Sequence, residues 1–212
     1  METRNNSMDY TVLPSNDVLQ KTIDALKERS IIPELVQTKE EALTRLQTLI
    51  PAGVTLMTGA SVTLQQIGFE QLLISGKHPW KNLKDQIMAE KDPKVLRTLR
   101  KQSTLADYFI GSVNAIAQTG ELVNASATGS QLPAYAYSGD HVVWVVGAQK
   151  IVPTLEDAIR RVRDYVVPLE DQHMKSMLAI GTTLGKILIF ERESPFQKRS
   201  LTLLLVNEVL GF

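Results

Sequence analysis

Two apolar runs, Val142–Val146 and Leu201–Val206, constrain the fold most strongly. Each is far shorter than the roughly 20 residues that span a bilayer, and each has the length of a buried β-strand. A strand that is apolar almost throughout is typical of a sheet covered on both faces. Shorter strand-like runs at Val54–Thr58 and Asp107–Gly111 alternate with helical patterns. This alternation predicts an α/β protein with a mostly parallel, Rossmann-like sheet.

The two ends of the chain are expected to depart from this regular alternation. Capping patterns at Ser15–Asp17 and at Thr38 with Glu41 predict two helices, so residues 1–52 are expected to form a helical N-terminal arm packed on the core. Residues 53–212 are expected to form the α/β domain, in one structural unit with the arm. Near the C-terminus, Lys186–Glu191 and Leu201–Val206 are expected to pair as a hairpin, an antiparallel addition to the sheet.

The segment after Thr154 predicts two helices separated by Pro168. Thr154 caps the first helix, whose apolar residues are expected to face inward. The second helix is expected over Glu170–Leu178. Three basic side chains of the first helix are expected to face solvent, namely Arg160, Arg161 and Arg163.

Composition excludes several classes of function. Lys+Arg and Asp+Glu both total 23, so the chain lacks the excess positive charge on which nucleic-acid and anionic-membrane binding depend. Cysteine is absent, which excludes disulfides, thiolate nucleophiles and iron–sulfur clusters held by this chain. His78, His141 and His173 show no metal-ligand spacing, so no metal site is expected. The first ten residues lack the apolar core of a signal peptide, and a cytoplasmic protein is expected.

Four segments follow one another along the chain: Met57–Leu64 with Ile67-Gly68, Ala106–Ala117, Thr119–Val123, and Val145–Gly147 running into Lys150–Val152. In this order they resemble the lactate-utilisation (LUD) domain family. The resemblance extends over about Leu19 to Phe212, which is almost the whole chain. It implies a three-layer fold similar to sugar-phosphate isomerases and CoA transferases, with a parallel sheet between helices. It also implies a role beside iron–sulfur partners in L-lactate oxidation, in which a chain without cysteine would be the cluster-free, non-redox component.

The first candidate site is the strand–turn–helix segment from Thr58 to Leu64. Gly59 allows a sharp turn after the strand, and the hydroxyls of Thr58, Ser61 and Thr63 would suit a phosphate or carboxylate beside the free N–H groups of the next helix. Alternatively, Ser61 only caps this helix, because a cap and an anion site use the same groups. The segment lacks the Gly-Lys-Ser/Thr of a P-loop, so hydrolysis of nucleoside triphosphates is not expected.

A second candidate site is the predicted hairpin turn that contains Thr119, Gly120 and Glu121. CoA transferases of the similar fold use a glutamate nucleophile, and LUD relatives often carry a glutamate directly before the Thr-Gly pair. This chain has Gln118 at that position, which cannot act as a nucleophile or a general base. Glu121 is therefore the only candidate catalytic residue of this turn, and its alternative role is that of an ordinary exposed strand residue.

Further candidate ligand-binding residues follow other predicted strands. The loop from Asn124 to Gln131 offers hydroxyl groups and a flexible glycine at the carboxyl ends of the strands, where ligands bind in open α/β sheets. Asn114 and Lys150 also follow strands; Asn114 is otherwise a turn residue and Lys150 otherwise a solvated lysine. The loop residues in question are Ser126, Thr128 and Gly129.

These observations leave three hypotheses about function. The first is a protein that binds a small anionic metabolite in lactate or related organic-acid utilisation, with iron–sulfur lactate-oxidation proteins as possible partners. The second is an enzyme acting on CoA thioesters or sugar phosphates, which rests on similarity of fold alone. The third is an assembly protein whose N-terminal arm docks a partner or a second copy, and the neutral net charge permits a homo-oligomer. The sequence names no cofactor.

Overall fold

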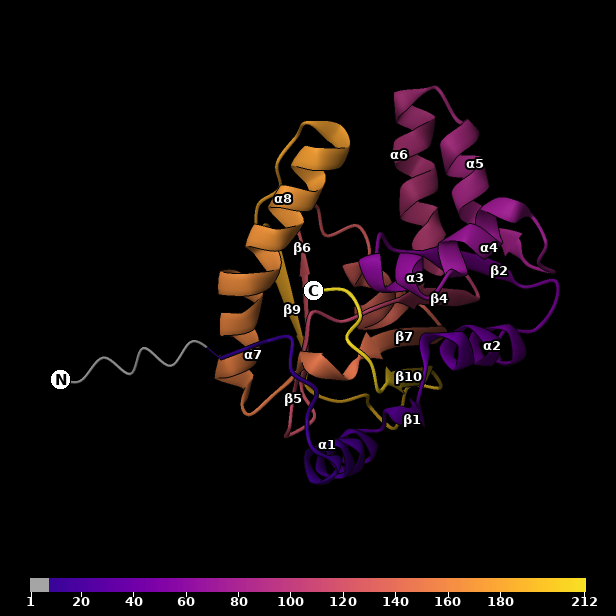
Figure 1. Cartoon of the computed structure of the whole chain (residues 1–212). Helices are drawn as coiled ribbons and strands as arrows, with labels where there is room; N and C mark the ends of the chain where they lie inside the picture. Colours follow the sequence, from indigo (N-terminus) through magenta and orange to yellow (C-terminus); the bar gives the residue numbers. More distant parts are fainter. Residues whose placement is uncertain (1–7) are drawn as a thin grey trace.

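The computed structural model describes residues 8–212 and confirms an α/β protein (Figure 1). Its main sheet has six strands, all parallel, in the order β1-β10-β7-β4-β2-β3. These strands are β1 (Ile32–Val36), β2 (Thr55–Thr58), β3 (Lys81–Asn82), β4 (Tyr108–Gly111), β7 (His141–Gly147) and β10 (Ser200–Val206). As the apolar runs predict, β7 and β10 lie side by side in the middle of the sheet, where both faces are covered.

A second, smaller sheet has four strands in the order β8-β5-β6-β9. They are β5 (Ala115–Ala117), β6 (Leu122–Ser126), β8 (Ile151–Val152) and β9 (Lys186–Phe190). The predicted hairpin between β5 and β6 is present, since the two strands pair antiparallel. β9 pairs antiparallel with β6, whereas β8 is parallel to β5.

Eight α-helices cover the two sheets over the described part of the chain. They are α1 (Asn16–Glu28), α2 (Lys39–Leu49), α3 (Val62–Gln66), α4 (Phe69–Ser75), α5 (Leu83–Ala89), α6 (Pro93–Gln102), α7 (Leu155–Arg161) and α8 (Val167–Leu178). Ser15, Thr38 and Thr154 cap α1, α2 and α7 through their hydroxyls, as the capping patterns predict. No helix within residues 8–212 is both long enough and apolar enough to cross a bilayer.

Alternation along β7 separates the core into layers. Val143 and Val145 face a cluster built with α2, α3 and α4, while Val142 and Trp144 face α1 and the second sheet. The outer face of the second sheet packs on α7. The layers are therefore helices, main sheet, second sheet with α1, and a last helical layer formed by α7.

Two expectations about the ends of the chain are wrong. The N-terminal segment is not purely helical, because β1 lies between α1 and α2 and forms the edge of the main sheet; residues 1–7 of that segment lie outside the described residues. Pro33 is tolerated there because an edge strand needs fewer backbone donors. The hairpin at the C-terminus does not form, since β9 and β10 belong to different sheets.

Pro168 does not separate two helices. A π-helical turn, Val162–Val166, joins α7 to α8, and the proline lies in the first turn of α8. A loosened hydrogen-bond ladder at a π-turn accommodates a residue that has no backbone N–H. The chain therefore rises from α7 into α8 as one irregular helix (Figure 1).

Candidate functional site

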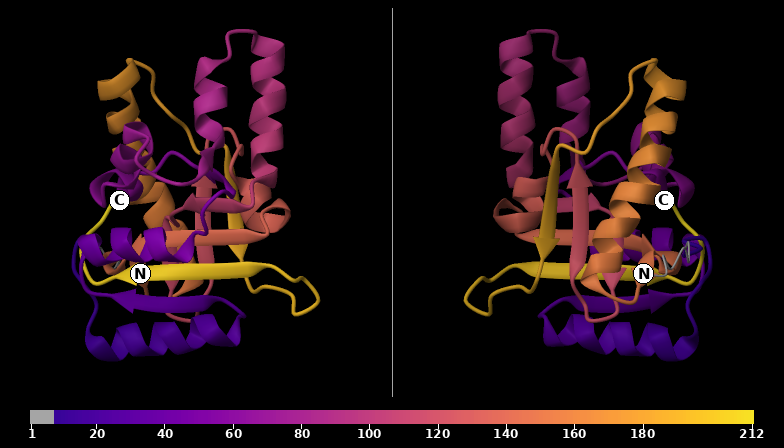
Figure 2. Two further views of the ribbon diagram at one scale, coloured as in Figure 1. Left: turned by 90° about the vertical axis from the view of Figure 1, so that its right-hand side faces the viewer. Right: turned by 90° about the vertical axis from the view of Figure 1, so that its left-hand side faces the viewer.

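A cavity of about 540 Å³ lies at the carboxyl ends of β2 and β4. The turns that follow these strands form its floor, and α8 with the loop after β6 forms one side. On the other side stand α5 and α6, a helical pair that projects in the same direction as α8 (Figure 2). The predicted residues Thr58, Gly59, Ser61, Thr63, Asn114, Ser126, Thr128 and Lys150 all line this cavity. Its position at the ends of parallel strands is the usual ligand position in open α/β folds.

Lys150 is the charged group of the cavity floor. It ends a short 3₁₀ turn, Ala148–Lys150, and its residue is only 2% exposed. Nζ donates to Thr63 Oγ1 at 3.1 Å, to Ser112 Oγ at 3.3 Å and to the Val113 carbonyl oxygen at 3.2 Å. None of these acceptors is a carboxylate, and burial, together with the nearby Arg161, lowers the pKa of Lys150 to about 7. Lys150 is thus a buried cavity residue rather than a solvated lysine.

Arg161 is a second buried cation near the floor, although its charge predicts exposure. It is 0% exposed and donates through Nη1 to the Asn114 carbonyl oxygen, while Nε and Nη2 have no hydrogen-bond partner among the described residues. The guanidinium carbon lies 5.4 and 5.2 Å from the ring centroids of Tyr10 and Tyr165. Burial lowers the pKa of Arg161 to about 10. Arg161 follows Ala158 by three positions and shares the inward face of α7, so helical spacing could have placed it correctly.

Asn114 holds the floor together as well as lining it. Its Oδ1 accepts a hydrogen bond of 2.7 Å from the Ala125 backbone N–H, which ties the start of β5 to the end of β6. Its carbonyl oxygen accepts the bond from Arg161. Asn114 therefore lines the cavity, and its side chain bonds across the hairpin to Ala125 rather than to its own turn.

The segment from Thr58 to Thr63 supplies one cavity wall, but several of its groups are already engaged. Ser61 Oγ accepts a hydrogen bond of 3.3 Å from Leu64 N–H and so caps α3, a helix of only five residues. Thr58 is buried, and its Oγ1 has no hydrogen-bond partner in the described part of the chain. Gly59 allows Gln131 to approach, because a Cβ there would lie 2.4 Å from Gln131 Oε1.

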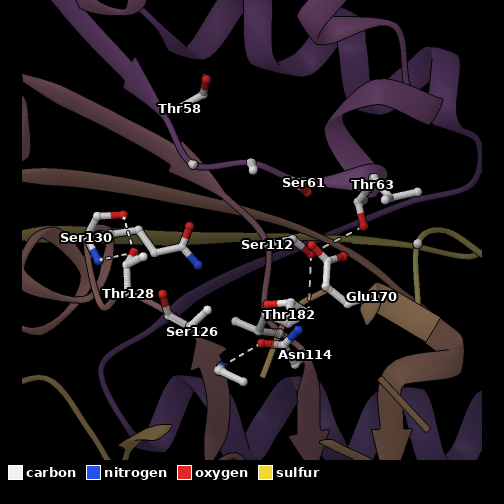
Figure 3. A pocket seen from close by; sticks show the side chains of 18 of the residues that line it. Thr58, Ser61, Thr63, Ser112, Asn114, Ser126, Thr128, Ser130, Glu170 and Thr182 are labelled. Carbon is white, nitrogen blue, oxygen red and sulfur yellow. Dashed lines mark hydrogen bonds between the residues drawn. The ribbon is translucent and has the colours of Figure 1, made fainter. Parts of the chain in front are cut away.

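The loop after β6 also bonds largely to itself. Ser126 Oγ accepts from Gly129 N–H at 2.9 Å, and Thr128 Oγ1 lies 3.2 Å from Ser130 Oγ. Figure 3 shows Thr128 and Ser130 away from Glu170, with Ser126 and Thr182 between them. Gly129 itself does not line the cavity and packs against the Lys186 side chain. The loop is thus a folded wall rather than a flexible connection.

Thr119, Gly120 and Glu121 lie outside the cavity, at the other end of β5 from Asn114. Glu121 forms an ion pair with Arg29 and accepts a hydrogen bond from Thr119 Oγ1. Arg29 also donates through Nε to the Thr119 carbonyl oxygen at 2.7 Å. These contacts attach the C-terminal end of α1 to the hairpin turn. The second candidate site therefore lies apart from the cavity, and the Glu121 carboxylate is occupied by a structural contact.

The cavity contains residues that the sequence interpretation missed. Ser112 follows β4 at the carboxyl end of the sheet, so the rule that located Thr58 could have located it as well. Glu170 projects from α8 into the cavity, and burial raises the pKa of its carboxyl (Figure 3). Gly211 and Phe212 also line the cavity. The buried side chain of Gln149 fixes the residue before them, because its amide donates to the Leu210 carbonyl oxygen and accepts from the Leu210 N–H. No local sequence pattern marks these last contacts.

Tyr135 forms part of the cavity wall and depends on a glycine. Its ring is buried edge-on between Phe109 and Trp144, with centroid distances of 5.4 and 5.6 Å. A Cβ at Gly111 would lie 1.8 Å from the Tyr135 hydroxyl oxygen. The end of β4 must therefore carry glycine for this ring to occupy its place.

Gly111→Ala is expected to lower the free energy of unfolding by about 3 kcal/mol, because the new methyl group must displace a buried aromatic ring. Urea denaturation would measure this loss. Tyr135→Phe removes the closest atom, so the double variant should lose less than the sum of the two single variants. Tyr137→Phe, at a side chain exposed to solvent, is the matched control. Additive losses would show that the two side chains do not compete for this space.

No cluster of three metal-binding side chains occurs among residues 8–212. The sequence profile described as LUD domain matches residues 19–206. No curated protein sequence matches the chain. Among solved structures, a DUF162 family protein from Deinococcus radiodurans is similar in fold, with a TM-score of 0.57 and 12% sequence identity over 92% of this chain and 100% of that chain. Because the profile match extends over most of the sequence, the chain belongs to the LUD domain family.

Proposed function

We propose that the protein binds a small anionic metabolite in this cavity and acts as a non-redox component of lactate or related organic-acid utilisation. The single observation that carries the proposal is the environment of Lys150. A lysine that is 2% exposed, faces a cavity and has only neutral acceptors leaves a buried positive charge unbalanced. An anion beside Nζ would restore neutrality, as a charged partner does for most buried charges.

The other charged groups of the cavity support an anionic ligand. Lys84 and Arg100 line the side formed by α5 and α6, and Glu170 is the one acidic side chain among the described lining residues. Lys84 is itself paired with Glu70 at 3.6 Å, whereas Lys150 is the buried cation of the lining and has no carboxylate partner among the described residues. The hydroxyls of Thr63 and Ser112 supply polar contacts at the same point. A carboxylate or a phosphate would satisfy this set.

The size of the cavity also bears on the ligand class. Cavities of roughly 300–1,000 Å³ accommodate drug-sized ligands, so 540 Å³ leaves room beyond a three-carbon acid. Apolar side chains from α5 and α8, including Met88 and Met174, line the outer part. A larger organic acid, or a short acid bound with ordered water, is compatible with this space. Membership of the LUD domain family is what supports an organic-acid pathway.

Thermal denaturation with a panel of anions tests this function. The panel contains L-lactate, pyruvate, CoA, acetyl-CoA, sugar phosphates and inorganic phosphate, each matched in ionic strength with chloride. A ligand at 100 times its dissociation constant adds about 2.7 kcal/mol of stability, which raises Tm by about 5–10 °C in a chain of this size. Lys150→Met is expected to abolish the rise, whereas the exposed Lys21→Met, on α1, should preserve it.

Two outcomes would contradict the proposal. If no anion raises Tm, the cavity is not an anion site, and docking of a partner through the N-terminal segment becomes the better explanation. If an anion raises Tm equally in Lys150→Met and in the parent protein, that anion binds without the buried lysine. A rise limited to CoA or sugar phosphates would favour enzymatic handling of those compounds over lactate metabolism.

A further inference from the structure

We propose that Lys150 is a nucleophile whose Nζ forms an imine with the carbonyl carbon of a 2-oxo acid bound in the cavity. This inference rests on the proposed function, because it requires an anionic ligand at the same place. Its basis is a juxtaposition of groups: Lys150 lines the cavity, its Nζ contacts two hydroxyls and one carbonyl oxygen, and a second buried cation, Arg161, lies nearby. Lysines that act as nucleophiles are characteristically desolvated or placed beside another cation, and Lys150 is both.

The protonation state of Lys150 is compatible with this role. An amine attacks only when it has lost a proton, and an exposed lysine is almost wholly protonated at pH 7. Burial and Arg161 bring the pKa of Lys150 to about 7, so a large share of the side chains would carry a free electron pair at neutral pH. Lys84 lines the same cavity but is not buried in the same way, because its side chain is partly exposed and paired with Glu70.

The reaction balances without an oxidant or a reductant. The Nζ electron pair forms a bond to the carbonyl carbon, and the carbonyl oxygen takes up a proton to give a carbinolamine. That oxygen then leaves as water with a second proton, while nitrogen and carbon form the double bond. Both protons come in net terms from the amine, so an amine and a ketone give an imine and one water molecule.

Two hydroxyl groups that can carry these protons contact the nitrogen. The Ser112 and Thr63 hydroxyls contact Nζ and lie 3.4 Å apart, so a proton can pass from the amine to the departing oxygen through either of them. Glu170 projects into the cavity from α8, and its raised pKa favours the protonated form that can act as an acid (Figure 3).

A 2-oxo acid is the substrate class that carries both groups this site requires, a carboxylate for the buried positive charge and a carbonyl carbon for the amine. Its carboxylate compensates the positive charge of the floor, and its carbonyl carbon, next to that carboxylate, is the electrophile. A simple aldehyde or ketone would leave Lys150 and Arg161 without a counter-charge. A 2-hydroxy acid such as lactate carries the same carboxylate without an electrophilic carbon, so it should bind and not react.

Reductive trapping tests the proposal in the intact protein. The protein is incubated with pyruvate and cyanoborohydride at pH 7, and the product is analysed by intact mass and by peptide mapping. We expect one adduct with the mass of pyruvic acid less one oxygen atom, located on Lys150. Labelling at Lys150 should exceed that at Lys84 about tenfold or more, because Lys150 is buried with its pKa lowered to about 7, whereas Lys84 is paired with Glu70. Excess L-lactate should reduce the labelling by competition.

The outcomes separate this inference from the proposed function. Lys150→Arg keeps the positive charge but cannot form the imine, so it should retain a Tm rise with pyruvate and lose the adduct. A Tm rise in the parent protein without an adduct on Lys150 would overturn the imine and leave anion binding intact. Equal labelling of Lys150 and Lys84 would also overturn it. Neither a Tm rise nor an adduct would overturn both, and the mapping of the parent protein remains decisive if the arginine variant does not fold.

Discussion

Replacement of Arg199 by methionine is expected to lower the free energy of unfolding by about 3–5 kcal/mol, the usual cost of removing one partner of a buried ion pair. Arg199 Nη1 lies 3.1 Å from Glu193 Oε2, with the two side chains 4% and 10% exposed. The substitution would leave the Glu193 carboxylate buried without its counter-charge. Chemical denaturation followed by circular dichroism would measure the loss.

Arg199 also supports the wall of the candidate site, which gives the variant a second consequence. Its guanidinium donates to the carbonyl oxygens of Ala134, Tyr135 and Gly139 at 2.7–2.9 Å. These groups belong to the π-helical turn Ala134–Ser138 and the residue after it, the turn that carries the cavity residue Tyr135. The variant is therefore expected to bind anions more weakly as well as to unfold more easily.

Arg192→Met provides the matched control, because Arg192 is a nearby exposed arginine. Its substitution should change the free energy of unfolding by no more than about 0.5 kcal/mol. A loss of less than about 1 kcal/mol in Arg199→Met would show that the pair contributes no more than an exposed ion pair does. Adding Glu193→Gln to Arg199→Met should recover part of the loss, since the uncompensated charge is then removed.

Much of the fold could be predicted because the relevant signals are local. The apolar runs at β7 and β10 require cover on both faces, and this places them in the middle of a parallel sheet. Ser15, Thr38 and Thr154 mark helix starts through a hydroxyl that needs only its own backbone neighbours. The general position of the cavity follows from the same topology, since parallel strands end at one edge.

The errors arose where distant contacts override a local pattern. Pro33 is typical of a helix end, yet pairing with β10 recruits its segment as an edge strand. Lys186–Phe190 and Ser200–Val206 are close in sequence, but β9 is partly or fully exposed up to its last residue, whereas β10 is buried almost throughout. The two strands therefore belong to different sheets. Glu121 resembles a catalytic carboxylate only until Arg29 is seen beside it. Such pairings over about ninety residues leave no trace in local spacing.

Lys150→Met is expected to change how stability depends on pH. In the unfolded chain Lys150 keeps its proton up to about pH 10.5, whereas in the folded protein its pKa is about 7. Between these values the unfolded state binds more protons, so this residue makes the folded state more stable as pH rises, by up to about 1.4 kcal/mol per pH unit. Below pH 7 both states are protonated, and the full cost of burying the charge applies.

Comparing Lys150→Met with the parent protein isolates the contribution of Lys150 to the pH dependence of stability, because the other groups are the same in both proteins. Any stability advantage of Lys150→Met should be largest near pH 6–7 and should shrink steadily toward pH 10. The lost hydrogen bonds to Thr63, Ser112 and Val113 add only an offset that does not vary with pH. Lys21→Met, at an exposed lysine, should show no such trend. Parallel curves for Lys150→Met and the parent protein would mean that these three acceptors keep Lys150 protonated in the fold. A permanently protonated Lys150 could bind an anion but could not act as a nucleophile. This measurement therefore also decides between anion binding and imine formation as the role of Lys150 Nζ.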